Sequence, residues 1–363
     1  MKNGWQMKKL GDLLEVQNGY AFDSNAFSSA EGMPLIRIRD LKVGTETEAR
    51  FSGDYDEKYV VNSGDFLIGM DGEFGCYEWK GKPALLNQRV CRLQNFCPSL
   101  SARFLFYGVN SHLKAIEDVT GYATVKHLSS KQILGITFPM PPPHEQERIV
   151  GILDEAFDGI TTAKANAEKN LQNARALFES HLHRVDGEKA LLRDLVKITT
   201  GKLDANAAVD GGQYPFFTCS REIYAIDHFA FDCEAILLAG NNAVGDFNVK
   251  HYKGKFNAYQ RTYVITVNEK KRVLYRFLYF QLLRSLKTFK VQSVGAGTKF
   301  LKLGMIQDLE IALPSLAEQH RIVSTMDSIR KQTERLESIY KSKLAALEAL
   351  KKSLLYQAFT GAL

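Results

Sequence analysis

The glycines of this sequence are the first residues whose spacing is typical of chemistry. Gly69, Gly72 and Gly75 are spaced like a glycine-rich cofactor loop, but no strand-helix-strand pattern surrounds them. A phosphate-binding P-loop needs an upstream glycine and a hydroxyl residue after Gly-Lys, and Gly81-Lys82 and Gly201-Lys202 have neither. The glycines therefore predict no cofactor-binding residues.

The proline run, the histidines and the cysteines also lack catalytic spacing. An amino-methyltransferase motif has Asn or Asp before a proline pair and an aromatic residue after it, and Met140 to His144 has neither. His181 and His183 lie two residues apart on a predicted helix and so face different directions. The five cysteines are odd in number and form no C-x-x-C pair, which argues against a disulfide framework or a zinc site. We therefore expect no catalytic residue, no metal ligand and a reducing, cytoplasmic location.

Positive charge alternates with aromatic residues between Arg261 and Lys302, a pattern typical of nucleic-acid binding. Glu269 is the one acidic residue in this segment. The basic residues are Arg261, Lys270, Lys271, Arg272, Arg276, Arg284, Lys287, Lys290, Lys299 and Lys302. The corresponding part of the first half is less basic, with Arg89, Arg92, Arg103, Lys114, Lys126 and Lys131. These cations could neutralise phosphates, and a solvated helix face is the alternative interpretation.

Reading a DNA sequence needs Arg, Lys, Asn or Gln side chains that reach base edges from loops. The candidates in the first half are Arg37, Arg39, Lys42, Asn87, Gln88, Thr124 and Lys126. Those in the second half are Lys202, Arg221, Asn241, Asn242, Tyr259, Gln260, Thr298 and Lys299. A residue present in both halves suits the fold or a phosphate better than base selection. We therefore favour Asn241 and Asn242 over Gln260 as base contacts.

The segments that must position these residues form an internal repeat with a period of about 175 residues. Five matches occur in the same order in both copies. They are Leu10-Gly11-Asp12-Leu13 with Leu192-Arg193-Asp194-Leu195, Gly19 with Gly201, Gln88-Arg89 with Gln260-Arg261, Arg103-Phe104-Leu105 with Arg276-Phe277-Leu278, and Glu145-Gln146 with Glu318-Gln319. Chance is a poor explanation for this order.

Each copy begins with a strand-rich part and ends in a long helix. Short β-branched and aromatic runs such as Pro34–Ile38, Asp65–Ile68 and Arg261–Val267 predict strands. Ala102–Ile116 and Tyr275–Phe289 predict one short amphipathic helix in each copy.

Apolar residues at alternating three- and four-residue steps then predict two coiled-coil helices. Ser315 and Glu318 form a start signal for the second helix, and Gly361 a stop signal. About 40 residues at 1.5 Å each give a rod on the order of 60 Å, too long to bury its seam on one small domain. The polar seam positions Asn170 and Lys343 indicate that one orientation is specified. The residues expected to pack the helices or bind partners are Ile149, Leu153, Ile160, Ile322, Met326, Ile329, Leu336 and Leu347.

Composition is that of a globular chain. Its 363 residues suggest two or three domains, 45% of them are hydrophobic, and the formal charge is +6. The first thirty residues do not resemble a signal peptide, and no apolar run approaches the roughly 18 residues that a membrane helix needs.

The doubled motifs resemble the specificity subunit of Type I restriction-modification systems. The features that carry this resemblance are Leu-x-Asp-Leu with a later glycine, the Gln-Arg strand, Gly-x-x-Thr running into Lys (Gly121 to Lys126 and Gly295 to Lys299), and Glu-Gln-x-Arg-Ile-Val opening each long helix. The resemblance covers essentially the whole chain, twice. The second copy departs from it in lacking the triple proline.

The resemblance implies an α+β fold in which two pseudo-twofold-related globular target-recognition domains are separated by two long antiparallel coiled-coil helices. The expected bounds are 1–143 and 187–314 for the recognition domains, and 144–186 and 315–363 for the helices. It implies a non-catalytic protein that binds a bipartite site on double-stranded DNA with two methyltransferase subunits and restriction/translocase subunits, no membrane, and no cofactor of its own.

Three alternatives remain open. They are a self-sufficient enzyme, a coiled-coil adaptor that dimerises through its helices, and a stand-alone DNA-binding regulator. DNA modification by the purified chain would favour the first, and failure to bind duplex DNA alongside methyltransferase partners would favour the second. A lack of neighbouring methyltransferase genes would favour the third.

Overall fold

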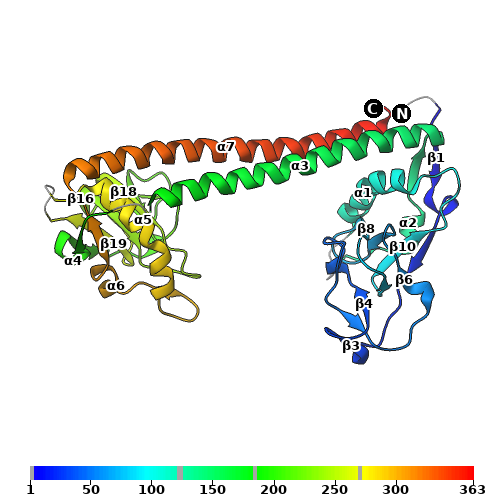
Figure 1. Cartoon of the computed structure of the whole chain (residues 1–363), viewed down its shortest axis with the longest axis horizontal. Helices are drawn as coiled ribbons and strands as arrows, with labels where there is room; N and C mark the ends of the chain where they lie inside the picture. Colours follow the sequence, from blue (N-terminus) through cyan, green and yellow to red (C-terminus); the bar gives the residue numbers. More distant parts are fainter. Residues whose placement is uncertain (1–3, 121–125, 183–185, 269–271) are drawn as a thin grey trace. The chain divides into compact units, whose positions relative to one another are not determined.

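The computed structural model describes residues 4–120, 126–182, 186–268 and 272–363. The chain divides into two compact units, and each is described by itself (Figure 1). The first unit contains residues 1–165 and 344–363, and the second contains residues 166–343. Two long helices, α3 (Pro143–Leu182) and α7 (Leu316–Thr360), each contribute to both units.

The first unit places three small sheets beside one packed helix. The strand orders are β1-β11, β2-β10-β7-β8 and β3-β5-β4-β9-β6, and α1 packs against β8 (Figure 1). The strands are β1 Gln6–Lys9, β2 Glu15–Asn18, β3 Phe27–Ser28, β4 Met33–Ile36, β5 Arg50–Phe51, β6 Val60–Val61, β7 Phe66–Gly69, β8 Gly75–Glu78, β9 Ala84–Leu86, β10 Val90–Gln94 and β11 Thr137–Met140. The helices are α1 Ala102–Val119 and α2 Ser130–Leu134, with 3-10 turns at Leu10–Asp12, Ser24–Ala26, Ile38–Asp40 and Glu57–Tyr59.

The second unit has a larger sheet, of order β13-β19-β16-β18-β14-β15, against which α5 packs through β16 and β18. Two further pairs, β12-β21 and β17-β20, complete it. The strands are β12 Glu188–Leu191, β13 Val196–Thr200, β14 Tyr214–Phe217, β15 Tyr224–Ile226, β16 Phe231–Ala239, β17 Asn241–Asn242, β18 Val249–Ala258, β19 Thr262–Val267, β20 Lys299–Phe300 and β21 Glu310–Leu313. The helices are α4 Leu192–Leu195, α5 Tyr275–Gln292 and α6 Leu303–Gln307, with a 3-10 turn at Ala205–Ala207.

The repeated glycines lie where two backbone segments touch. A Cβ atom on Gly19 would lie 2.0 Å from the carbonyl oxygen of Asn87, and one on Gly201 would lie 1.8 Å from that of Ala258. No side chain fits at either distance. Each glycine therefore lets the strand after Leu-x-Asp-Leu cross the residues that precede the turn at Gln88-Arg89 or Gln260-Arg261, called the Gln-Arg turn below.

A buried glutamine joins each strand-rich part to its long helix. Gln146 is fully buried, its Nε2 donates to the carbonyls of Ser99 and Pro141 at 2.8 Å, and its Oε1 accepts from Ser101 N at 2.8 Å. Gln319 is also fully buried and makes the same three bonds, to Arg272, Pro314 and Leu274. The repeated Glu-Gln motif is therefore a structural joint.

The two long helices run antiparallel within each unit. In the first unit, Arg148 donates to the Leu363 carbonyl at 2.7 Å, and Lys164, later in α3, pairs with Glu348, earlier in α7. In the second unit, Arg175 pairs with Glu337 at 2.8 Å. The predicted α+β class with long antiparallel helices is confirmed.

The predicted start and stop of α7 are also confirmed. The hydroxyl of Ser315 accepts a hydrogen bond from Glu318 N at 3.3 Å. Gly361 follows the last helical residue with a φ of 76°, a conformation that suits glycine.

The predicted seam is partly right. Ile149 and Leu153 are fully buried, Ile160 and Met326 are nearly so, and Ile322, Ile329 and Leu347 are half-buried. Asn170 and Lys343 are exposed and Leu336 is 38% exposed, so these three were wrongly assigned to the seam. The predicted seam stepped three residues from Thr333 to Leu336. In the structure the residue that faces α3 after Thr333 is Glu337, four residues on, which pairs with Arg175.

Candidate nucleic-acid interface

The candidate loop after β4 carries two side chains with acidic neighbours. Arg37 Nε lies 3.7 Å from the Asp40 carboxylate, and Lys42 Nζ lies 2.5 Å from that of Glu73. Arg39 is exposed. Because both Lys42 and Glu73 are more than 60% exposed, their ion pair is weakly held and Lys42 can exchange it for a phosphate.

The other first-half candidates differ in accessibility. Asn87 is buried, and its Oδ1 accepts from Gln88 N at 2.9 Å, which fits a structural role in the turn. Lys126 Nζ donates to the Glu117 carbonyl at 2.6 Å. Thr124 lies outside the described residues.

The second-half candidates gather on the β17-β20 pair. Asn241 lies opposite Phe300 and Asn242 lies opposite Lys299, and Thr298 directly precedes this strand. The sequence had placed these residues on separate loops, and the structure brings them together. Lys202 is exposed beside Gly201, on the strand crossing described above.

Asn242 and Arg221 order the loop that follows β17. The Oδ1 of Asn242 accepts from Val244 N at 2.9 Å and from Asp246 N at 3.0 Å. The carboxylate of Asp246 in turn accepts from Arg221 at 2.7 Å. Asn242 thus caps its own loop, while the Oδ1 of Asn241 is buried without a hydrogen-bond partner among the described residues. Asn241 is the better placed of the two to bind a ligand.

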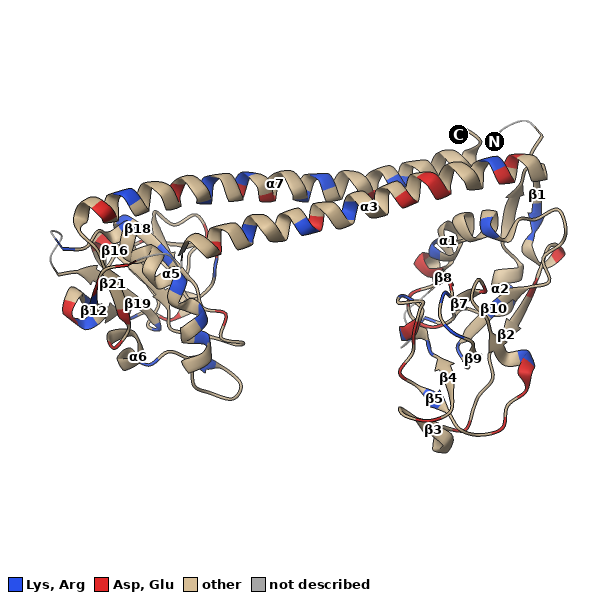
Figure 2. Cartoon of the chain, viewed as in Figure 1, with Lys and Arg blue, Asp and Glu red and all other residues tan. Residues whose placement is uncertain are grey.

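This loop borders a cleft of about 740 Å³ within the second unit. Arg221, Asp246 and Lys250 line it together with α5 and with residues of α3 and α7. Figure 2 shows Lys and Arg along α5, and three of these residues, Arg284, Lys287 and Lys290, line the cleft. Lys287 pairs with Glu179 at 2.6 Å. Within the described parts of the chain, Arg284 and Lys290 have no acidic partner, so the cleft keeps positive charge that suits a phosphate backbone.

Lys250 is a half-buried cation of this cleft. Its Nζ donates to the Ser220 carbonyl and to Asn248 Oδ1, both at 2.6 Å. Burial, with a smaller effect of nearby Arg221, lowers the pKa of Lys250 from 10.5 to about 8. The lysine is therefore charged at neutral pH at a cost in stability that disappears when it loses its proton.

Replacing Lys250 with Met is expected to remove one pH dependence of folding. Below pH 8 the folded and unfolded states both carry this charge, and between about 8 and 10.5 only the unfolded state does. The unfolding free energy of the wild type should therefore rise, relative to Lys250→Met, as the pH increases through this window. Urea unfolding on either side of the window measures the difference. Lys253→Met, an exposed site on the same strand, is the control, and parallel curves for wild type and Lys250→Met would contradict the expectation.

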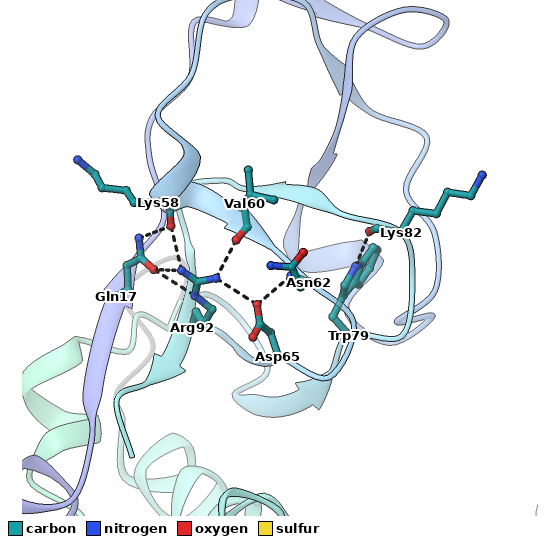
Figure 3. Close-up of polar contacts among 8 residues, drawn as sticks. All are labelled: Gln17, Lys58, Val60, Asn62, Asp65, Trp79, Lys82 and Arg92. Carbon is teal, nitrogen blue, oxygen red and sulfur yellow. Dashed lines mark hydrogen bonds and ion pairs between the residues drawn. The ribbon is translucent and has the colours of Figure 1, made fainter. Parts of the chain in front are cut away.

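Some predicted cations serve the fold instead. Figure 3 shows Arg92 enclosed by acceptors: it donates to Gln17 Oε1 at 2.6 Å, to the Val60 carbonyl at 2.8 Å and to Asp65 at 3.1 Å. Arg92 thereby fastens β10 to the segment around β6. Arg276 likewise pairs with Asp327 and lies over the ring of Phe280, 5.0 Å from its centroid.

Sequence reasoning missed the side chains that surround the Gln-Arg turn. Asp71 and His127 meet beside Arg89 in the first unit, and Phe300 meets Arg261 in the second. The one available signal was that both copies have an arginine at the same place in the motif.

Two further groups of side chains bear on chemistry. Within residues 4–120, 126–182, 186–268 and 272–363, no three His, Cys, Asp or Glu side chains are grouped as metal ligands would be. Burial raises the pKa of the Cys91 thiol to about 12, so it is not a ready nucleophile.

No helix in the described parts of the chain is long and apolar enough to cross a membrane.

Comparisons with known proteins find the same family in both halves. The family described as "Type I restriction modification DNA specificity domain" matches residues 2–172 and 185–345. The specificity subunit of the Type I restriction enzyme EcoBI from Escherichia coli is 28% identical over 414 residues, which cover 99% of this chain and 86% of that subunit. The EcoDI specificity subunit from Escherichia coli is 45% identical over 159 residues, which span 43% of this chain and only 34% of that subunit.

Solved structures share the fold. A chain from the structure titled "Structural basis underlying complex assembly and conformational transition of the type I R-M system" aligns with a TM-score of 0.74 at 17% identity, covering 99% of this chain and 98% of the other. The HsdS subunit from Thermoanaerobacter tengcongensis aligns with a TM-score of 0.54 at 17% identity, covering 100% and 98%.

Proposed function

Because this chain belongs to the Type I restriction modification DNA specificity family, we propose that it is the non-catalytic subunit that selects the DNA sequence for a Type I restriction-modification enzyme. The observation that carries this proposal is the double family match. Each match falls on a strand-rich part with its own glycine crossing and its own buried glutamine joint.

We propose that residues 1–143 read one half of a bipartite site on double-stranded DNA and residues 187–314 read the other. The two halves keep the same joints but differ in the side chains near their Gln-Arg turns, so each would select different bases. Residues 144–186 and 315–363 would hold the half-sites about one helical turn of DNA apart.

The helices also offer a surface for partners. We propose that two methyltransferase subunits bind along α3 and α7 and that restriction/translocase subunits join them, in the cytoplasm. S-adenosylmethionine and ATP would then belong to these partners. Exposed apolar side chains such as Leu177, Ile339 and Leu350 support such a docking surface.

The test is to map methylated DNA sites in cells that carry the complete system with and without this chain. We expect methylation at one bipartite sequence, present only when the chain is present. Methylation that is unchanged without the chain would contradict the proposal.

Lys299→Ala is expected to weaken DNA binding by the full chain in complex with its partners and to lower the salt slope by about one unit. The reason is that Lys299 lies on β20 beside Asn242, where it can meet a phosphate. The same expectation holds for Lys126→Ala. Binding titrations over a salt series measure the slope, with Lys189→Ala, paired with Glu310, as the control. A slope equal to that of the wild type would remove Lys299 from the interface.

A further inference from the structure

Each unit contains a corner where three segments meet through the same backbone hydrogen bonds. In the first unit, Met70 N donates to the Arg89 carbonyl at 2.9 Å, and Leu128 N donates to the Met70 carbonyl at 2.7 Å. In the second unit, Gly240 N donates to the Arg261 carbonyl at 2.9 Å, and Leu301 N donates to the Gly240 carbonyl at 2.9 Å. The following residues also pair alike, Asp71 with His127 and Asn241 with Phe300.

The corners share an exposed arginine and differ in its two neighbours. In the first corner, Asp71 Oδ1 lies 2.6 Å from His127 Nδ1, and Arg89 Nε lies 3.5 Å from Asp71 Oδ2. In the second corner, Arg261 lies over the Phe300 ring, 4.9 Å from its centroid. The same backbone arrangement thus presents a carboxylate and an imidazole beside the arginine in the first unit, and an amide and an aromatic ring in the second.

Two features of the corners are unfavourable for the isolated protein. The Oδ1 of Asn241 is buried without a hydrogen-bond partner among the described residues, which costs stability unless a ligand supplies a donor. Arg89 has a φ of 71°, a left-handed conformation that is strained for a residue with a side chain. Strain of this kind is concentrated at binding sites, and Arg89 keeps 55% of its side chain exposed.

We propose that these corners determine which bases each unit reads, an inference that rests on the proposed function. The kept arginine binds the DNA at a common point, and the two variable neighbours set the base. In the second corner, Asn241 reads an adenine once DNA binding turns its amide outward: its Oδ1 then accepts from the adenine N6 amino group while its Nδ2 donates to N7. In the first corner, Asp71 and His127 occupy the places of Asn241 and Phe300, so this corner selects a different base.

The test uses the wild type and variants, each assembled with its methyltransferase subunits. Affinity is measured for a duplex carrying the mapped site and for duplexes in which each base pair is substituted in turn. Asn241→Ala should weaken binding to the mapped site roughly 5- to 150-fold. It should also lose discrimination at one A·T pair of the second half-site and keep it at every other position.

A second variant guards against local misfolding. Asn241→Asp with Phe300→His places the side chains of the first corner on the same backbone, which accommodates them in the first unit. This exchange should change the preferred base at that one position. Gln260→Ala, on the adjacent turn, is the matched control and should read the same bases as the wild type.

The outcomes separate the two proposals. Unchanged discrimination at every position in both variants overturns this inference and leaves the proposed function standing. Discrimination lowered equally at all positions, or lost at a pair other than A·T, also overturns it. A wild-type complex that shows no base preference overturns the proposed function and this inference together.

Discussion

Gln146→Ala is expected to lower the free energy of unfolding by about 3–5 kcal/mol. The side chain is fully buried and pairs with two carbonyls and one amide, those of Ser99, Pro141 and Ser101. Alanine would leave all three backbone groups without partners in a place that water reaches poorly. It would also detach the start of α3 from the loop before α1.

Urea unfolding of the full chain measures this effect. Gln319→Ala should cost a similar amount, because the second joint has the same three bonds and is equally buried. Gln88→Ala is the matched control: its side chain is exposed, and the unfolding free energy should change by less than about 0.5 kcal/mol. A loss below about 1 kcal/mol at both joints would mean that water replaces the amide, and that the glutamines are not structural joints.

Removal of seven residues from each long helix is expected to abolish modification of the original site and create a new one. Residues 166–172 of α3 and 339–345 of α7 lie between the Lys164–Glu348 and Arg175–Glu337 pairs, so a matched deletion keeps both pairs. A whole heptad preserves the face that each helix turns to its neighbour. The helices shorten by about 10 Å, and the spacer between half-sites should shrink by about three base pairs.

Methylation mapping distinguishes a change of spacer from a change of bases. The two half-site sequences should stay the same while the interval between them decreases. Asn170→Ala, an exposed substitution within the same stretch, should leave the interval unchanged. New half-site sequences with the old interval would show that the helices do not set the spacing.

The elements with strong periodicity were predictable from the sequence. The predicted helices Ala102–Ile116 and Tyr275–Phe289 correspond to α1 and α5, each extended by three residues. The long helices were equally clear, because an apolar seam sustained over many turns is rarely found outside a long helix. The misassigned Leu336 shows the limit of this prediction. After Thr333 the seam could continue at Leu336 or at Glu337, and only the position of the neighbouring helix decides between them.

The β17-β20 pair could not be predicted, since strands of two residues have no period. Asn241 and Phe300 lie 59 positions apart and meet only because α5 turns the chain back. Charge patterns were also ambiguous, because Arg92 and Lys299 look alike in sequence. Only the acceptors around Arg92, contributed by residues 17, 58, 60 and 65, identify it as structural.

The repeated motifs were visible in the sequence without their roles. Gly19 and Gln146 stood out as matches, yet only the geometry explains them as a backbone crossing and a buried joint. Their presence in both copies reflects a shared construction. This is why the residues that differ at the corners are better candidates for sequence choice than those that are the same.

The first and last strands of each strand-rich part are paired with each other, Gln6 opposite Met140 and Glu188 opposite Leu313. The long segment between these paired strands therefore begins and ends at the same place in each unit, next to the start of a long helix. Such a segment can be replaced by one of different length and fold without changing the path of the flanking chain. Under the proposed function, such a chain would acquire a new target in one genetic exchange, with its long helices unaltered.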